Sequence, residues 1–295
     1  MSKENNQEHV VGIFGGLALY EPDFLDEWEP VVVDTPYGKP QYLYQGTLDG
    51  VKVVYARRWF RNQEFRPPTA LYEMQRAVVY AFKKLGVSQI IIHDGAGSIN
   101  RAYELGDFLL VQDFIDFTSK FKQSYYTEMD SLCVNIPFNT PFCPETNSVA
   151  LEAAKKLNIR LLDCVMAITE GPRFETPAEI RFFDRAGCDA VCQGILPEIV
   201  FARELGMCYT AIFSVCNYAS GVKRPGDWTI EEWNLVEYRI MPQVQALIKE
   251  IIRKLPAARS CNCENYLQEN TFKVELSIKN GLMKQGLEEW PEESK

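Results

Sequence analysis

Residues 169–221 read TEGPRFETPAEIRFFDRAGCDAVCQGILPEIVFARELGMCYTAIFSVCNYASG, and this stretch decides the architecture of the chain. Thr176 is a suitable N-cap and Pro177 fits the first helical position. Glu179, three residues after the cap, completes a capping box. Gly187 follows as the residue that ends the helix. The stretch therefore begins with a loop and a short, well-capped helix.

A strand, a helix and a second strand follow in the same stretch. The apolar run Ala190–Cys192 predicts a short buried strand that ends at Gln193. The segment Pro197–Gly206 predicts a helix, and Cys208–Tyr218 predicts a longer strand that places Asn217 at its end. Because ligands bind at strand ends in alternating α/β chains, polar residues at these positions are candidate ligand contacts.

The same alternation continues on the N-terminal side of this stretch. Val10–Gly16, Val51–Arg57 and Gln89–His93 have the β-branched composition of strands. Helical patterns fall at about 68–85 and 147–157. We therefore expect a single α/β domain, with a central mixed or mainly parallel β-sheet flanked by helices on both faces.

The C-terminal part has a different pattern. Residues 227–254 predict one long helix with Asp227 as its cap, and a polar break at 256–265 precedes a second helix over 266–285. We therefore divide the chain into a flexible tail, a domain and a C-terminal helical extension, at residues 1–9, 10–255 and 256–295.

Composition excludes several classes of function. The chain has 295 residues, 46% apolar content, a net charge of −9 and a pI near 5.0, which describe a globular protein without the clustered cations that nucleic acid requires. No run is long enough to span a membrane, and the polar N-terminus lacks the apolar core of a secretion signal. We expect a cytoplasmic protein that binds neither nucleic acid nor membrane.

The cysteines suggest reduced thiols. Of nine cysteines, four lie in apolar runs, namely Cys164, Cys192, Cys208 and Cys216. Buried thiols of a cytosolic protein fit this pattern better than a disulfide framework. Cys261 and Cys263 lack a second cysteine pair or a nearby histidine, since His9 and His93 are far apart in sequence. We therefore expect no metal site.

Several further segments carry a family resemblance when taken in order along residues 10–250. With GPRFETPAE, GCDAV and LPEIVFARELG, the chain resembles the trimeric purine nucleoside phosphorylase and methylthioadenosine phosphorylase family, and most of all its methylthioinosine branch. The other matching segments are VVGIFGG at the start of the domain, VDTPYGKP at 33–40, GAGSIN at 95–100, ELGDFLLVQDFID at 104–116 and PFCPET at 141–146. The resemblance implies a nucleoside phosphorylase-like fold, a homotrimer and cleavage of a purine nucleoside without an organic cofactor.

Three residues are candidates for the purine pocket. Breaking the bond between sugar and base leaves negative charge on the purine, which hydrogen-bond donors stabilise. In the resembled family an asparagine at the position of Asn217 favours a 6-oxopurine, and Glu175 would accept the N1–H of such a base. Phe174 is placed to face the base or the sugar. The alternative is that Glu175 and Asn217 belong only to a helix-entry turn and a strand-end turn.

Two residues bear on the sugar. Gln193 departs from the family pattern, which has methionine here against the ribose. Either its amide hydrogen-bonds a hydroxyl group of the sugar, or the substitution means that the sugar of the substrate differs from that of the family. Ile230 aligns with a position at the 5′ end of the sugar, where an apolar side chain resembles the branch that accepts 5′-methylthio nucleosides.

The family binds phosphate with three loops, and all three are altered here. The first loop, GGTG in the family, reads Gly15-Gly16-Leu17-Ala18, so the hydroxyl is lost and a Cβ replaces the last glycine. The second loop, RHG, reads Arg57-Arg58-Trp59-Phe60-Arg61. Arg57 matches the family arginine, and Arg58 and Arg61 either add anion-binding capacity or point to solvent.

The third loop, TTA or TNA in the family, reads His93-Asp94-Gly95. A carboxylate about 4 Å from a phosphate oxygen would cost on the order of 4 kcal/mol at an effective dielectric of 20. Asp94 would instead pair with Arg57, fill the anion site and act as a general base for water. The alternatives are a structural Arg57–Asp94 salt bridge in a protein without catalysis, and a different anion held by Arg58 and Arg61.

Three functional hypotheses remain open at this point. The first is phosphorolysis of a purine nucleoside, in which phosphate is a co-substrate. The second is hydrolysis or transfer to another acceptor with Asp94 in the phosphate site. The third is a non-catalytic nucleoside-binding subunit. In a trimer, the loop over 114–143 of a neighbouring subunit would complete the sugar site, with Phe117, Phe121 and Phe138 as its apolar candidates.

Overall fold

The computed structural model describes most of the domain. The described residues are 9–40, 42–58, 68–119, 123–126, 133–223, 229–269 and 271–272. Arg61, Phe121 and Asp227 lie outside them, as do residues 1–8 of the expected tail and most of the expected terminal helix.

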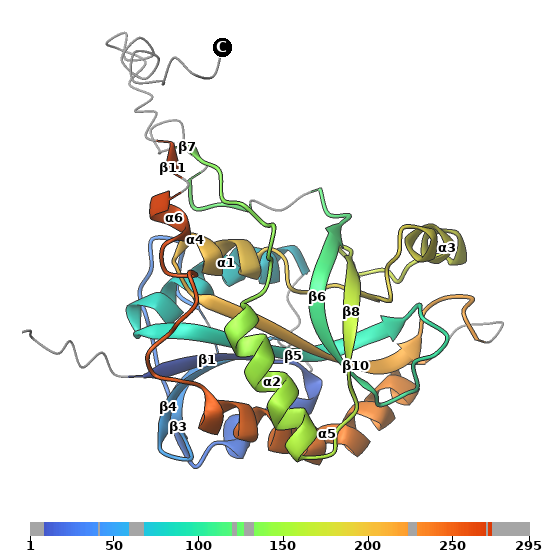
Figure 1. The fold of residues 1–295 in the computed structure, drawn as a ribbon, viewed down its shortest axis with the longest axis horizontal. Helices are drawn as coiled ribbons and strands as arrows, with labels where there is room; N and C mark the ends of the chain where they lie inside the picture. Colours follow the sequence, from blue (N-terminus) through green and yellow to red (C-terminus); the bar gives the residue numbers. More distant parts are fainter. Residues whose placement is uncertain are drawn as a thin grey trace, which may run out of the picture.

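Nine strands form one mixed sheet, in the order β10-β6-β8-β9-β5-β1-β4-β3-β2 (Figure 1). Their bounds are β1 Val10–Gly15, β2 Glu27–Pro30, β3 Leu43–Leu48, β4 Val51–Arg57, β5 Val87–Ser98, β6 Phe108–Asp116, β8 Leu161–Ile168, β9 Ala190–Cys192 and β10 Cys208–Tyr218. Strand β10 also pairs with β5, so five strands close into a ring: β5, β10, β6, β8 and β9. The expected central mixed sheet is confirmed.

Helices cover both faces of this sheet. Their bounds are α1 Pro68–Lys84, α2 Pro144–Lys156, α3 Pro177–Arg185, α4 Glu198–Glu204, α5 Ile230–Lys254 and α6 Tyr266–Glu269, with short 3-10 helices η1 at Leu17–Leu19 and η2 at Pro22–Phe24. One apolar core includes side chains of α1 and α4, and a second includes side chains of α2 and α5. The two helix pairs lie on opposite sides of the strands in Figure 1.

The decisive stretch folds as its sequence predicts. Thr176 accepts the backbone N–H of Glu179, and Glu179 accepts the N–H of Thr176, which is the expected capping box. Gly187 has φ of +88° just after α3, a left-handed conformation that glycine adopts without a steric penalty. Strand β10 has the predicted bounds.

Three expectations need correction. Helix α5 begins at Ile230 and is capped by Thr229 through a capping box with Glu232, whereas we expected the cap at Asp227. Strand β5 continues from the expected end at His93 to Ser98, because β10 pairs with it over that whole length. The terminal helix ends at Glu269, after which a two-residue strand, β11 at Thr271–Phe272, pairs with β7 at Cys133–Val134.

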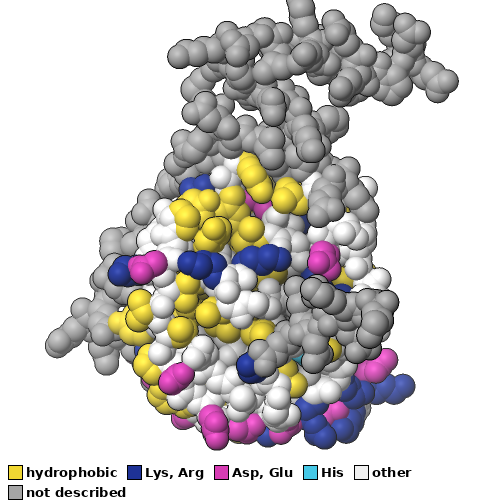
Figure 2. All heavy atoms as spheres, turned by 90° about the vertical axis from the view of Figure 1, so that its left-hand side faces the viewer, with side chains coloured by type: hydrophobic (Ala, Val, Ile, Leu, Met, Phe, Trp, Pro, Cys, Tyr) yellow, Lys and Arg dark blue, Asp and Glu magenta, His cyan; other side chains and the backbone are white. Residues whose placement is uncertain are grey.

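The molecular surface carries no continuous basic band on the face drawn in Figure 2. Hydrophobic side chains gather in the upper part of that face, and Lys and Arg side chains are scattered among acidic ones. Among the described residues, no helix is long and apolar enough to cross a membrane.

Candidate active site

Asn217 lies at the end of β10, beside the end of β5. It pairs in register with Gly97, which on its other side pairs with Val191 of β9. A Cβ at Gly97 would stand 3.4 Å from the Asn217 Nδ2 atom and 3.4 Å from Val191 Cγ1. The glycine therefore leaves room for the asparagine amide at the point where the ends of β5 and β10 lie beside the start of β9.

Glu175 is fixed to the end of β9 from the other side. Its Oε1 atom accepts the Thr169 hydroxyl at 2.6 Å, and the Thr169 N–H donates to the Cys192 carbonyl at 3.0 Å. The glutamate is 9% exposed. Glu175 is thus tied through Thr169 to the last residue of β9, and Asn217 pairs with Gly97, which pairs with the middle residue of the same short strand.

The other candidate residues of the purine and sugar pocket are more exposed. The Gln193 Nε2 atom donates to the Arg173 carbonyl at 3.0 Å, so this amide helps to close the loop that holds Glu175. Phe174 is 48% exposed and Ile230, the first residue of α5, is 49% exposed. One turn later in α5, the Trp233 indole lies against Gly95, which places the start of this helix beside the altered anion loops.

At the altered anion loops, Asp94 occupies a buried position among protein groups. Its Oδ1 atom accepts the N–H of Gly95 at 2.9 Å, and a Cβ at Gly16 would stand only 2.5 Å from that same atom. Its Oδ2 atom lies 2.9 Å from the Arg58 Nε atom. The carboxylate therefore contacts all three loops that would form the phosphate site.

The expected pairing of Asp94 with Arg57 is wrong. Arg57 binds the Glu21 carboxylate at 2.5 Å, donates to the Tyr20 carbonyl at 3.0 Å and lies over the Tyr20 ring. Arg58 is the arginine that pairs with Asp94. Because successive side chains of an extended chain point to opposite faces, Arg57 and Arg58 at the end of β4 cannot both reach Asp94.

Arg58 has a second acidic partner that the sequence did not reveal. Its Nη1 atom lies 2.5 Å from Glu198 Oε1, and the side chains of Arg58, Asp94 and Glu198 are 3%, 4% and 0% exposed. We expected the segment around Glu198 only to form a helix. The sequence contains one signal for this role, which is that Glu198 lies in an apolar run between Leu196 and Ile199. A carboxylate buried in such a run requires a buried partner of opposite charge.

Glu237 is a further buried carboxylate at this site. Its Oε2 atom accepts the N–H of Ala18 at 3.0 Å, and its Oε1 atom accepts the Cys216 thiol at 2.6 Å. Burial, and to a smaller degree the nearby Asp94 charge, raises the pKa of Glu237 to about 7. Its sequence signal is its spacing of three and seven residues from the buried Ile240 and Val244, which places it on the core face of α5.

His93 adds no positive charge here. Burial lowers the pKa of its imidazole to about 3, and its Nε2 atom lies 2.7 Å from the Ser214 hydroxyl. Among the described residues around Asp94, one guanidinium therefore faces the carboxylates of Asp94 and Glu198, with the Glu237 carboxyl group nearby. The balance of charge among these described groups disfavours a dianion such as phosphate.

Comparison with known proteins identifies the family. The family model of the Phosphorylase superfamily matches residues 10–253. The chain belongs to this superfamily. This confirms the resemblance read from the order of the motifs, and with it the nucleoside phosphorylase-like fold.

Named relatives of this superfamily member are nucleoside phosphorylases. The chain is 36% identical to an S-methyl-5′-thioadenosine phosphorylase of Pyrococcus furiosus, over 88% of this chain and 97% of the relative. It is 35% identical, over the same shares, to a protein of Dictyoglomus turgidum named a probable 6-oxopurine nucleoside phosphorylase. A solved methylthioadenosine phosphorylase from Schistosoma mansoni in complex with adenine shares the fold, with a TM-score of 0.80, 23% identity and coverage of 89% and 98% of the two chains.

Proposed function

We propose that this phosphorylase-superfamily protein cleaves the N-glycosidic bond of a 6-oxopurine nucleoside, without an organic cofactor. The relatives named above support cleavage of a purine nucleoside. The presence of an acceptor, Glu175, and a donor, Asn217, near the short strand β9 supports the 6-oxopurine. Glu175 would accept the N1–H of the base, and the Asn217 amide would donate toward N7 or O6, where negative charge develops as the bond breaks.

We propose further that water replaces phosphate as the acceptor. The observation that carries this step is the buried Asp94–Arg58–Glu198 group. Among the described residues of this group, two carboxylates outweigh one guanidinium, so a phosphate dianion would face a net formal charge of −1. A single like-charge contact at about 4 Å costs on the order of 4 kcal/mol, which corresponds to roughly a thousandfold in affinity.

In this reaction Asp94 would act as the general base. The oxygen of water forms a bond to C1′ while the bond from C1′ to the purine nitrogen breaks, and the electron pair of that bond leaves with the base. The water proton moves to the Asp94 carboxylate. The leaving purine takes a proton from solvent, and the products are the free base and the free sugar.

The experiment that tests both steps uses inosine and 5′-methylthioinosine, each with and without phosphate, with identification of the base and sugar products. Hypoxanthine with unphosphorylated sugar, formed at the same rate with and without phosphate, is the expected result. Formation of a sugar 1-phosphate would overturn the proposal that water is the acceptor, but it would support the proposal that the protein cleaves the nucleoside. No hypoxanthine under any condition would overturn the proposed reaction.

We propose a homotrimer as the assembly, as the family resemblance implies. Of the aromatic residues expected to reach a neighbouring sugar site, Phe117 stacks on Phe183 at 4.4 Å between ring centroids, and Phe138 lies under the Arg203 guanidinium. Both therefore already pack within their own subunit. Light scattering coupled to size-exclusion chromatography would test the assembly, and a monomeric mass would overturn it.

A further inference from the structure

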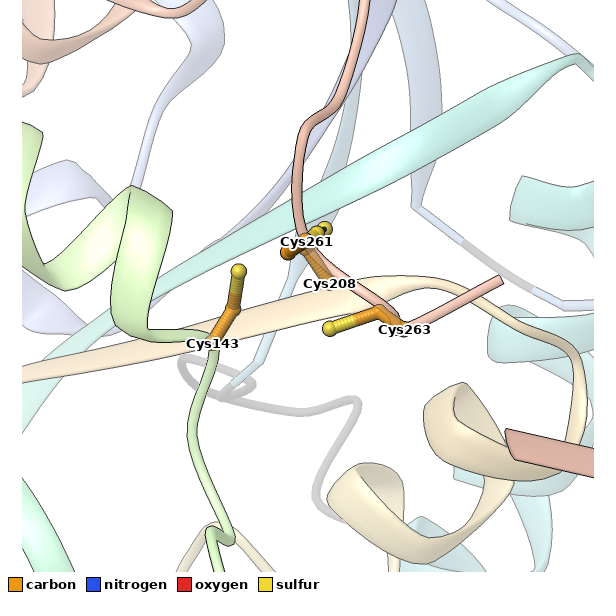
Figure 3. A group of neighbouring side chains, drawn as sticks. All are labelled: Cys143, Cys208, Cys261 and Cys263. Atoms are coloured by element: carbon orange, nitrogen blue, oxygen red, sulfur yellow. Dashed lines mark hydrogen bonds between the residues drawn. The ribbon is translucent and has the colours of Figure 1, made fainter. Parts of the chain in front are cut away.

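Four cysteine side chains from three separate segments converge at the edge of the domain (Figure 3). Cys143 precedes α2, Cys208 is the first residue of β10, and Cys261 and Cys263 lie in the segment that follows α5. The expectation that Cys261 and Cys263 lack a second pair of cysteines nearby is therefore wrong. The sheet supplies the missing pair, because the start of β10 carries Cys208 next to Cys143, whose N–H donates to the Tyr209 carbonyl.

The spacing of the sulfur atoms is that of metal ligands. All four Sγ atoms lie within 4.8 Å of one another, and those of Cys208 and Cys261 are 3.4 Å apart. A tetrahedral zinc ion with Zn–S bonds of about 2.3 Å separates its sulfurs by about 3.8 Å. A disulfide would need about 2.05 Å. All four cysteines are free thiols in this structure.

The surroundings of the cluster suit an anionic centre. Cys143 is the N-cap residue of α2, where the helix dipole favours negative charge. The Arg259 Nη1 atom lies 3.9 Å from the Cys208 sulfur and is held in place by the carbonyl of Gly206 at 2.8 Å. Four thiolates on a divalent ion leave a net charge of −2, which this guanidinium partly offsets.

The segment that carries Cys261 and Cys263 is itself fixed. Glu145, in the first turn of α2, accepts the backbone N–H of Ser260 and of Cys261 and the Ser260 hydroxyl, at 2.6 to 3.3 Å. The backbone of Glu264 packs closely on Gly206. A Cβ added at Gly206 would lie 3.0 Å from the carbonyl oxygen of Glu264. The four ligands are thus preorganised by groups other than a metal.

We propose that Cys143, Cys208, Cys261 and Cys263 bind one zinc ion as four thiolates. Four protein ligands leave no position for water or substrate, so the site is structural. It joins the segment after α5 to the starts of α2 and β10. Cys208 and Asn217 are nine residues apart along one strand, which places the zinc about 30 Å from the purine site.

The test measures metal content in the full-length protein, purified under reducing conditions without chelator. Elemental analysis by mass spectrometry should give one zinc per chain. Replacement by cobalt should produce the strong thiolate-to-metal absorption of a tetrahedral cysteine site. Removal of zinc by a chelator should lower the Tm by several degrees, and zinc should restore it.

Cys261→Ser is the informative variant, because Cys261 is the least buried of the four ligands and its loss disturbs packing least. It should lose the stoichiometric zinc and the cobalt absorption. Cys188→Ser, a buried cysteine outside the cluster, is the matched control and should keep both. Protein without bound metal, a different metal, or disulfides among these cysteines in mass spectra of the unreduced protein would each overturn the proposal.

Discussion

The Nε atom of Arg58 lies 2.9 Å from the Oδ2 atom of Asp94, and both side chains are almost completely buried. Glu198 contacts the same guanidinium, so this group carries a net charge of −1. A buried group of this kind is stable only if every charge has a partner, because desolvation of an unpaired ion costs several kcal/mol. The Arg58 guanidinium is thus already engaged by two carboxylates, and its positive charge needs no phosphate for balance.

Asp94→Thr should move the protein from phosphate-independent to phosphate-dependent cleavage. The substitution removes the general base and leaves a neutral Arg58–Glu198 pair beside a hydroxyl that can donate to phosphate. We expect the phosphate-independent rate to fall by about 100-fold or more, which is the usual contribution of a general base. Initial rates of hypoxanthine release with and without phosphate check this.

Asp184→Asn serves as the control for Asp94→Thr, because Asp184 is an exposed carboxylate on α3, whereas Asp94 is buried. It should leave both rates unchanged. If Asp94→Thr retains the phosphate-independent rate, Asp94 is not the base.

Ligand-induced stabilisation should separate the base pocket from the altered anion site. A ligand present at 100 times its Kd stabilises the native state by about 2.7 kcal/mol. We expect hypoxanthine to raise the Tm measurably and millimolar phosphate alone to leave it unchanged. A rise in Tm with phosphate at constant ionic strength would show that the Asp94–Arg58–Glu198 group opens to admit an anion.

The sequence predicted the elements of residues 169–221 because their signals are local. A capping residue, the glycine that ends a helix and an apolar run each act within a few residues, as at Thr176, Gly187 and Ala190–Cys192. The ring closed by the pairing of β5 with β9 and β10 was not predictable in this way. Strand partners are set by contacts between distant segments, and a single sequence does not record them.

The same distinction between local and long-range signals applies to the residues of the site. Asp94 was recognised as an intruding carboxylate because its residue type alone conflicts with phosphate binding. Its partner was assigned to Arg57 instead of Arg58, since the side chain that points inward depends on where β4 ends and turns. The sequence did not reveal the role of Glu198 because its partner Arg58 lies 140 residues away, and it did not reveal the cysteine cluster because its three segments are 53 or more residues apart.

Asn217 substitutions should report on purine preference. Asn217→Asp presents an acceptor where the amide donated, so preference should shift from inosine toward adenosine. Asn217→Ala should lower kcat/KM for both nucleosides by roughly 30- to 150-fold, equivalent to about 2 to 3 kcal/mol for a lost hydrogen bond at a developing charge. Parallel kcat/KM measurements on the two nucleosides check both variants, and an unchanged preference in Asn217→Asp would place the base elsewhere.

Thr176→Ala should destabilise the helix that follows Glu175. The variant loses the side-chain cap of α3, which is worth about 1 kcal/mol. Because Glu175 directly precedes the cap, KM for the nucleoside should rise while kcat changes little. Urea unfolding and steady-state kinetics check the two effects. Thr176→Ser keeps the capping hydroxyl and should behave like the natural protein in both measurements.

Glu237 should make stability depend on pH in a direction opposite to that of most carboxylates. Burial raises its folded-state pKa to about 7 from 4.5, so between these values the folded protein binds a proton that the unfolded chain has lost. The stability from this group is therefore fully present below pH 4.5 and is lost as the pH rises to about 7. The total loss is roughly 3 kcal/mol.

The measurement for Glu237 is the free energy of unfolding in urea at several pH values, compared with Glu237→Gln. The glutamine keeps an acceptor for the Ala18 N–H and the Cys216 thiol but cannot ionise. The natural protein should lose roughly 3 kcal/mol relative to this variant between pH 4.5 and 7.5, whereas Glu231→Gln, an exposed neighbour on α5, should follow the natural protein. Parallel curves for the natural protein and Glu237→Gln would mean that the carboxyl group at 237 is ionised in the folded state across this range, and that the charge at the altered anion site is more negative by one.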